Sequence, residues 1–554
     1  MVKRSLLLPS YFANVFLVKE STMSKQGTQN AAKAAGLISA MFLLSRILGL
    51  LRESQTGSLF NRFQTDAFFA AFTIPDVMYY LLVGGALSAA FIPIFTEYLA
   101  GGKEEEGWKV ASTFINIVVI FLAGFTILGV IFTQYLTPII APHFTAEKLK
   151  LLIELTRIMF PAVCFTALAG LIGGILISYQ RFMGPALGPN IYNIGIICGA
   201  ALLGSQYGIK GMAYGVAAGA VGNFLSQLFF LRKQAANFYR FGYIDLKNPG
   251  FKRMLLLWIP ALIGLSADQA NIWATTAMAS QLPEGGITAI RFATRLVQLP
   301  IGIFAAGLST AFFPLLSSLS AAKKIEEFKD TLSFSLRSIF FIMMPASIAL
   351  IMLREPIVML LFERMKFTHQ DTLLTAEALL FYSLTIFAHA AILMLPRAFY
   401  SLQDTKTPVV VSFISVGSSI FLNWFFINYT GLGVKGFALS FSIMGLINMV
   451  LLMMILRRKI HGIRGYHIGE SFMKATVSAV IMGVAIYGVI LALTPYTRHL
   501  SGHWVAALQI CLGLGIGGSV FLVSAWLLKM DELQTVINLV KRKLLTRIMP
   551  GNNE

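Results

Sequence analysis

Residues 87–93 read LSAAFIP, and residues 308–314 read LSTAFFP, so the same short block occurs twice, 221 positions apart. Polar residues recur together with this apolar block. The matching pairs of segments are KEEE at 103–106 with KIEE at 324–327, and GIKG at 208–211 with GVKG at 433–436, the second at an offset of 225 that one loop insertion explains. Chance similarity between apolar segments does not repeat polar residues at both ends of a block. The chain therefore contains two copies of one unit.

The composition shows that this unit is built for a lipid bilayer. Of the 554 residues, 56% are hydrophobic and only 12% are charged, and the mean hydropathy is +0.74. Soluble globular proteins have roughly 45–50% apolar and about 25% charged residues. Soluble enzymes, disordered chains and fibrous proteins are thereby excluded. Cys164, Cys198 and Cys511 lie far apart inside apolar runs, which predicts neither a disulfide framework nor a cysteine metal site.

Membrane-spanning helices need about 20 mostly apolar residues. Fourteen segments qualify, near residues 34–58, 67–99, 109–134, 150–178, 185–204, 211–231, 254–280, 287–319, 331–353, 371–401, 408–428, 436–456, 470–494 and 504–528. Each copy of the repeat holds six of them, and because six is even, both copies enter the membrane from the same side. We predict an all-α polytopic membrane protein with about 14 transmembrane helices: two six-helix lobes related as parallel repeats, and two extra C-terminal helices.

The basic residues predict the orientation. Lys and Arg concentrate in the segments on the side of the N-terminus, and the positive-inside rule assigns such segments to the cytoplasm. Both termini are therefore expected in the cytoplasm, and the net charge of +19 reflects topology rather than a nucleic-acid-binding surface. The expected parts are a cytoplasmic N-terminal segment 1–33 with Met23 as an alternative start, an N-lobe 34–233 (spans 1–6), a C-lobe with its preceding basic loop 234–459 (spans 7–12), spans 13 and 14 within 460–530, and a basic cytoplasmic tail 531–554.

The first two spans carry ionisable residues, which cost at least about 2.5–3.5 kcal/mol each at the bilayer centre. In the first span, Arg46 and Glu53 share nearly one helix face at about 100° per residue, whereas Arg52 is turned away. The alternative is that Arg52 and Glu53 snorkel to the outer interface. Asp66 precedes the second span and is expected near the outer interface, as a cap of its own helix.

The eighth span carries Arg291 and Arg295 one turn apart, followed by Gln298. Like charges on one helix face repel, so an anionic or wet surface should lie opposite, and Asp268 in the seventh span is the expected counter-ion of Arg291. Arginines outnumber acids among these residues, which predicts a positive central cavity. A guanidinium binds two oxygens of a phosphate at once. The predicted substrate is an anion such as a phosphate or pyrophosphate, whereas a carrier of cationic drugs should show the opposite sign.

Enzyme motifs are missing from the sequence. No Gly-rich phosphate loop ends in Gly-Lys-Ser/Thr, and no His, Asp or Glu cluster has metal-ligand spacing. We predict a transporter without a cofactor or an ATPase motif of its own. Its energy would come from an ion gradient or the membrane potential, which is worth about 2.3 kcal/mol per charge per 100 mV.

Five sequence blocks together resemble one family. They are SRILG at 45–49 followed by Arg52 and Glu53, TDAFF at 65–69, ATRL at 293–296, FYS at 399–401 and DTKTP at 404–408. This set is similar to the signature of the bacterial lipid II flippases, the MurJ/MviN family within the multidrug, oligosaccharidyl-lipid and polysaccharide exporter superfamily. The resemblance extends from about Ala34 to the end of the fourteenth span.

The resemblance implies a function in peptidoglycan biosynthesis. Such a flippase moves an undecaprenyl-pyrophosphate-linked disaccharide-pentapeptide from the inner to the outer leaflet of the bacterial cytoplasmic membrane by alternating access. The resemblance implies that Arg46, Arg52, Glu53, Asp66 and Arg295 lie in the family's basic cavity, which receives the pyrophosphate and sugar. The charge pattern of the spans adds Arg291 and Gln298 to the expected cavity residues, with Asp268 as a possible charge partner. Spans 13 and 14 are expected to form a groove for the lipid tail. The expected partners are lipid II, membrane lipids, a coupling ion or the membrane potential, and cell-wall synthesis proteins, without nucleic acid.

The sequence departs from the family at three positions. Tyr79 stands where members often have a basic residue, Thr73 stands where some have Lys, and Gln298 stands where some have Glu. We hypothesise that Arg291 supplies part of the charge absent at Tyr79. Two other functions stay open at this point: a cation-coupled drug exporter or a flippase for another polyprenyl-linked glycan, and a non-transporting scaffold whose cavity arginines would tolerate replacement.

Overall fold

A computed structural model describes residues 25–80, 90–495, 501–535 and 537–538, and these residues form helices and connecting turns without β-strands. The elements of the first half are α2 (Lys25–Leu59), α3 (Arg62–Ala71), α4 (Thr73–Tyr79), α5 (Ile92–Ala100), α6 (Glu104–Ile140), α7 (Ala146–Ser178), α8 (Met183–Cys198), the π-helix η3 (Gly199–Leu203), α9 (Gly204–Tyr207), α10 (Ile209–Phe238) and α11 (Pro249–Ala279). Those of the second half are α12 (Gly286–Pro300), the π-helix η4 (Ile301–Ala305), α13 (Ala306–Ala321), α14 (Ile325–Met352), α15 (Arg354–Phe362), α16 (His369–Ser383), α17 (Ile386–Ser401), α18 (Lys406–Tyr429), α19 (Val434–Lys459), α20 (Gly465–Leu493) and α21 (Gly502–Leu527).

The prediction of an all-α polytopic membrane protein is confirmed. Within the described ranges, ten helices are long and apolar enough to cross a membrane, or eleven if the bent pair α16 and α17 counts as one span. The predicted spans 34–58, 67–99 and 254–280 correspond to α2, to α3–α5 and to α11, which are not among these. The count of fourteen stays a prediction. Met23 and most of the predicted tail 531–554 lie outside the described residues.

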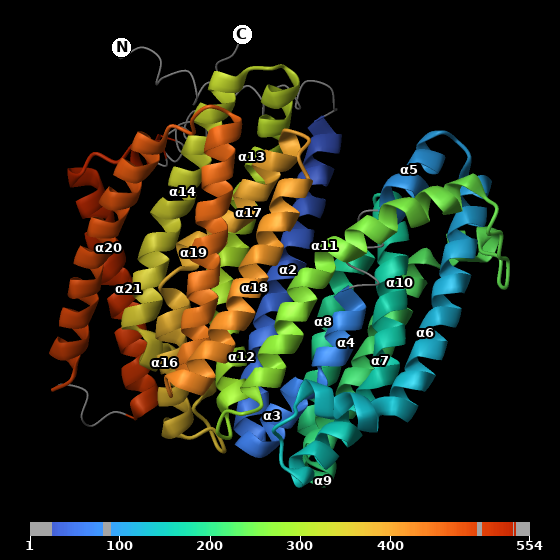
Figure 1. Cartoon of the computed structure of the whole chain (residues 1–554), viewed down its shortest axis with the longest axis horizontal. Helices are drawn as coiled ribbons and strands as arrows, with labels where there is room; N and C mark the ends of the chain where they lie inside the picture. The colour runs from blue at the N-terminus through green and yellow to red at the C-terminus, as the bar shows by residue number, and fades with distance from the viewer. Residues whose placement is uncertain (1–24, 81–89, 496–500, 536, 539–554) are drawn as a thin grey trace.

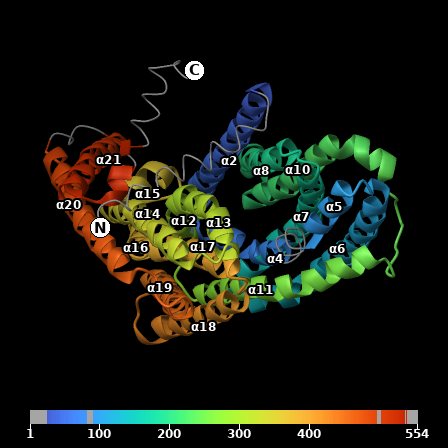
Figure 2. The ribbon, with the colours of Figure 1, turned by 90° about the horizontal axis from the view of Figure 1, so that it is seen from above.

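Two bundles of helices lie side by side (Figure 1). We refer to α2–α10 as the N-lobe and to α11–α19 as the C-lobe. Helix α11 links the two bundles, since it contacts α6 as well as α18, and both views show it running along one side of the molecule (Figures 1 and 2). Helices α20 and α21 pack on α14 and α15, at the edge of the C-lobe far from the N-lobe (Figure 2).

The internal repeat is visible in matching ion pairs of the two lobes. Lys210 on α10 contacts Glu154 on α7 at 2.7 Å, and Lys435 on α19 contacts Glu377 on α16 at 3.1 Å. The block 308–314 lies in α13, whereas its first copy is described only from residue 90 onward, at the start of α5. A lysine at the equivalent position of each copy therefore joins equivalent helices.

The turn between α17 and α18 is held by Asp404, which belongs to one of the sequence blocks that resemble the flippase family. Its carboxylate contacts Lys459 at 2.5 Å and accepts hydrogen bonds from the backbone and hydroxyl of Thr407. Burial alone would raise the pKa of Asp404, but the bonds to Lys459 and Thr407 and the lysine charge lower it to about 2. The ionised Asp404 carboxylate therefore stabilises the turn at neutral pH, and this stabilisation is lost only as the pH falls toward 2 and the carboxylate is protonated.

A glycine seam joins α8 and the following π-helix η3 to α10 in the N-lobe. A Cβ atom at Gly199 would lie 2.4 Å from Cα of Gly215, and one at Gly195 would lie 2.4 Å from Cα of Gly219. The two backbones are thus in direct contact, as in small-residue packing between membrane helices. This close contact fixes α8, whose Asn193 reaches toward α2.

We predict that Gly215→Ala destabilises the protein by about 1–3 kcal/mol, because the added methyl group meets backbone atoms that cannot rotate away. Thermal unfolding of the purified protein in detergent should show a lower Tm than the wild type. Gly124→Ala on α6, where a Cβ atom has nothing within 4 Å, is the matched control. Equal Tm values for the two variants would contradict the seam.

Candidate functional site

A cavity of about 640 Å³ lies between the lobes, against α2, α8 and the junction of α12 with η4. Its lining residues are Ser45, Arg46, Gly49, Leu50, Arg52, Glu53, Tyr80, Pro189, Tyr192, Asn193, Arg295, Gln298, Leu299, Ile301 and Gly302. Five of the predicted site residues are therefore brought together here. They are Arg46, Arg52, Glu53, Arg295 and Gln298.

Glu53 is the acidic centre of this cavity. Its Oε1 lies 2.9 Å from Arg52 and 3.4 Å from Arg295 of α12, so one carboxylate oxygen links both lobes. Arg52 also donates a hydrogen bond of 3.2 Å to Oδ1 of Asn193. The Glu53 side chain is only 2% exposed and that of Arg52 15%, so the alternative that both snorkel to the outer interface is wrong. Oε2 of Glu53 is buried without a hydrogen-bond partner among the described residues.

Arg46 and Glu53 were expected on nearly one helix face, but they do not contact each other. Arg46 instead donates a 3.1 Å hydrogen bond to the backbone carbonyl of Gly302 in η4. Glu53 accepts a hydrogen bond from Arg52, its neighbour in sequence, although the helical spacing places Arg52 on a different face of the helix. A long arginine side chain spans more of the helix surface than its Cα position indicates. Both arginines therefore reach the same cavity from different faces of α2.

Arg291 and Arg295 have separate acidic partners. Arg291 lies 3.6 Å from Asp76 and over the ring of Phe69, whereas Arg295 faces Glu53. Arg291 is not among the cavity-lining residues. The side chains of Asp268 and Tyr79 are outside the described part of the chain, so the expected Asp268–Arg291 pair stays a prediction.

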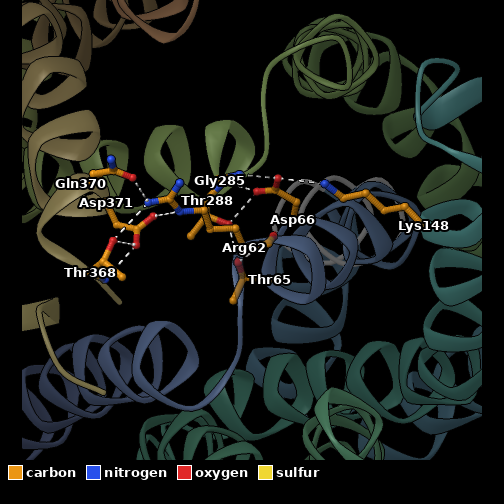
Figure 3. Close-up of polar contacts among 9 residues, drawn as sticks. All are labelled: Arg62, Thr65, Asp66, Lys148, Gly285, Thr288, Thr368, Gln370 and Asp371. Atoms are coloured by element: carbon orange, nitrogen blue, oxygen red, sulfur yellow. Dashed lines mark hydrogen bonds and ion pairs between the residues drawn. The ribbon is translucent and has the colours of Figure 1, made fainter. Parts of the chain in front are cut away.

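Asp66 is not part of the lining of this cavity, and its expected role toward substrate stays a prediction. It is 2% exposed and contacts Lys148 of α7 at 3.0 Å. Its two oxygens also accept hydrogen bonds from the backbone N–H groups of Gly285 and Thr288 and from the Thr288 hydroxyl, at 2.8, 2.9 and 2.7 Å (Figure 3). Asp66 thus caps α12 of the other lobe. Its own helix α3 is capped by Asn61 instead.

A second charged contact joins the lobes at the same end. Arg62, which starts α3, lies 2.5 Å from Asp371 of α16 and donates to Thr368 (Figure 3). We call the residues that join the lobes here the latch: Arg62, Thr65, Asp66, Lys148, Gly285, Thr288, Thr368 and Asp371. The start of α2 is at the opposite end of the molecule from α3 (Figure 1). The latch therefore closes one end of the interface between the lobes.

Four important residues were missed by the sequence analysis. Lys148 and Arg62 lie beside predicted spans, where a lysine or arginine is usual and gives no signal. Asp371 and Asp76 likewise carry no local pattern that names a partner. Arg62 and Asp66 are one helical turn apart, a spacing that would suggest an ion pair within α3, but each of them contacts a different residue.

Comparisons with known proteins identify the family. A family model described as "Lipid II flippase MurJ" matches residues 57–501. The "Probable lipid II flippase MurJ" of Buchnera aphidicola subsp. Acyrthosiphon pisum is 34% identical over 428 residues, covering 76% of this chain and 83% of the relative. The protein of the same description from Vibrio cholerae is 30% identical over 489 residues, covering 85% and 90% of the two chains.

Solved structures agree with the sequence comparisons. The structure titled "Lipid II flippase MurJ, inward closed conformation" is 27% identical, with a TM-score of 0.74, and covers 89% of this chain and 99% of that chain. An inward-facing multidrug transporter of the MATE family has a TM-score of 0.65 at 17% identity, with 75% and 94% of the two chains covered, and shares the fold. The family match covers well over half of the sequence, and the chain belongs to the lipid II flippase family.

Proposed function

We propose that this chain moves lipid II, an undecaprenyl-pyrophosphate-linked glycopeptide, from the inner to the outer leaflet of the bacterial cytoplasmic membrane for peptidoglycan synthesis. Family membership supports this function. The observation that carries it is the charge of the cavity, which is lined by Arg46, Arg52 and Arg295 but by one carboxylate, that of Glu53.

This charge matches a pyrophosphate. Arginine forks bind phosphate oxygens in pairs, and such charge-assisted bonds are stronger than neutral hydrogen bonds. A volume of about 640 Å³ falls in the usual range of about 300–1,000 Å³ for ligand pockets. A cationic drug would meet repulsion from the same arginines, so a drug exporter is disfavoured.

Transport is proposed to follow alternating access with the latch as the outer gate. If the N-terminus is cytoplasmic, α2 crosses the membrane outward, and the latch that follows it lies on the outer side. The described conformation then has its outer end closed by Asp66 and Arg62. Release of a headgroup into the outer leaflet requires these contacts to separate. Without an ATP-binding motif in the sequence, we expect an ion gradient or the membrane potential to drive the cycle.

We predict that Arg52→Ala and Arg295→Ala abolish growth of a flippase-depleted bacterium that the wild-type chain rescues. Each change removes a phosphate-binding fork and leaves Glu53 less compensated. Colony formation after depletion is the measurement, with immunoblots of membrane levels for each variant.

Lys233→Ala provides a matched control, because this basic side chain is exposed beyond the predicted spans. It should rescue like the wild type. Rescue by well-expressed arginine variants would show that the cavity is not used as proposed. Failure of a well-expressed wild-type chain to rescue would count against lipid II as the substrate.

We predict that Asp66→Asn opens the latch. The change replaces the charged carboxylate that caps α12 of the C-lobe with a neutral amide, which has one acceptor oxygen instead of two, so the contacts to Gly285 and Thr288 weaken. It also leaves the buried Lys148 of the N-lobe without its counter-ion, and breaking a buried pair in this way costs about 3–5 kcal/mol. Spin labels are placed at Glu147 and Met365, which are exposed on opposite sides of the latch, in a cysteine-free background. Pulsed electron paramagnetic resonance should then report a longer distance between the two labels in Asp66→Asn than in the protein with Asp66.

Lys150→Ala, a change of another lysine on α7 that is exposed, should keep the wild-type distances. If Asp66→Asn also kept them, the latch would not be holding the lobes together.

A further inference from the structure

The contact between Arg46 and Gly302 joins the two lobes inside the cavity. Arg46 comes from α2 of the N-lobe, and Gly302 belongs to η4, which continues α12 of the C-lobe. Nη2 of Arg46 donates to the Gly302 carbonyl at 3.1 Å, and both residues line the cavity. This differs from the other cavity arginines, Arg52 and Arg295, which have a carboxylate partner.

The π-helical turn explains why this carbonyl can accept from Arg46. The backbone N–H of Ala306 donates to the carbonyl of Ile301, five residues earlier, whereas in an α-helix it would donate to Gly302. The wider turn begins directly after Pro300. The Ala306 N–H is thus directed to Ile301, and the Gly302 carbonyl accepts from the guanidinium of Arg46.

The absence of a side chain at residue 302 makes room for the guanidinium. A Cβ atom there would lie 2.4 Å from Nη1, 2.7 Å from Nη2 and 3.0 Å from Cζ of Arg46. These three nearest atoms all belong to Arg46, so a methyl group at this position meets the end of a flexible side chain first. A side chain at this position would displace the arginine rather than the helix. By contrast, a Cβ atom at Gly307 of α13 has nothing within 4 Å.

We propose that Gly302 is a positioning residue for substrate binding, which holds the Arg46 guanidinium across the cavity through its carbonyl and its missing side chain. This proposal rests on the proposed function, because the group that Arg46 would then bind is the pyrophosphate of the lipid. A phosphate oxygen is a stronger acceptor than a neutral carbonyl. The headgroup therefore takes the guanidinium over from Gly302, and the tie between α2 and η4 is released when the cavity is loaded.

The test is a double-mutant cycle on lipid II binding. Purified wild type, Gly302→Ala, Arg46→Ala and the double variant are titrated with lipid II in detergent, and flipping at saturating lipid II is measured in proteoliposomes. We expect Gly302→Ala to weaken binding about tenfold, as displacement of one charge-assisted contact would. In the Arg46→Ala background, the same change should alter the Kd by less than about twofold, because its target is gone.

Gly307→Ala is the matched control and should bind like the wild type. Equal weakening by Gly302→Ala in both backgrounds would overturn the positioning role while leaving the flippase function intact. A wild-type protein that does not bind lipid II would instead contradict the proposed function itself.

Folding of the variants gives a second criterion. Should Gly302→Ala fail to accumulate in membranes, the double variant should accumulate again, because the three atoms nearest to the added methyl group all belong to Arg46. A double variant that also fails would assign Gly302 to the fold and refute the proposal.

Discussion

The buried carboxylate of Asp66 is the constraint on which the closed arrangement of the lobes depends. It takes a lysine ammonium from the N-lobe and two backbone N–H groups from the C-lobe. A buried charge that loses its partners costs several kcal/mol, and this carboxylate keeps its full set of protein partners only while the lobes remain together at this end. When they separate, Lys148 stays beside Asp66 in the N-lobe, and water can replace the contacts to Gly285 and Thr288. A polar latch of this kind closes firmly and still opens reversibly, as a transport cycle requires.

The charges of the cavity follow from the same closure. With α12 held by Asp66, Arg295 is brought to Glu53 of α2, and η4 is brought to Arg46. Arg52 and Arg295 share one carboxylate oxygen of Glu53, and Arg46 contacts only a neutral carbonyl. None of these contacts neutralises the cavity, so positive charge remains available in the interior. An anionic headgroup can exchange with these partners without leaving an arginine exposed to lipid.

Much of this architecture could be predicted from the sequence. Hydropathy and the repeated blocks predicted the helices and the two lobes, and the charges that are costly in a membrane pointed to Arg46, Arg52, Glu53 and Arg295. Their role toward substrate stays a prediction. Asp66 could not be read correctly, because its partners at Gly285 and Thr288 lie 219 and 222 residues away, whereas local rules assign such a residue to its own helix. Pairings across the lobes depend on how the copies meet, and no periodicity encodes that.

Opening of the latch during transport is the central claim, and a reversible cross-link tests it most directly. Thr65 and Thr288 face each other across the latch, with hydroxyl oxygens 2.8 Å apart, so cysteines at both positions can form a disulfide between the lobes. Lipid II flipping would be measured in proteoliposomes with this variant oxidised and then reduced, beside each single cysteine variant. We expect oxidation to stop flipping in the double variant alone and reduction to restore it. Undiminished flipping by the fully cross-linked protein would contradict the account.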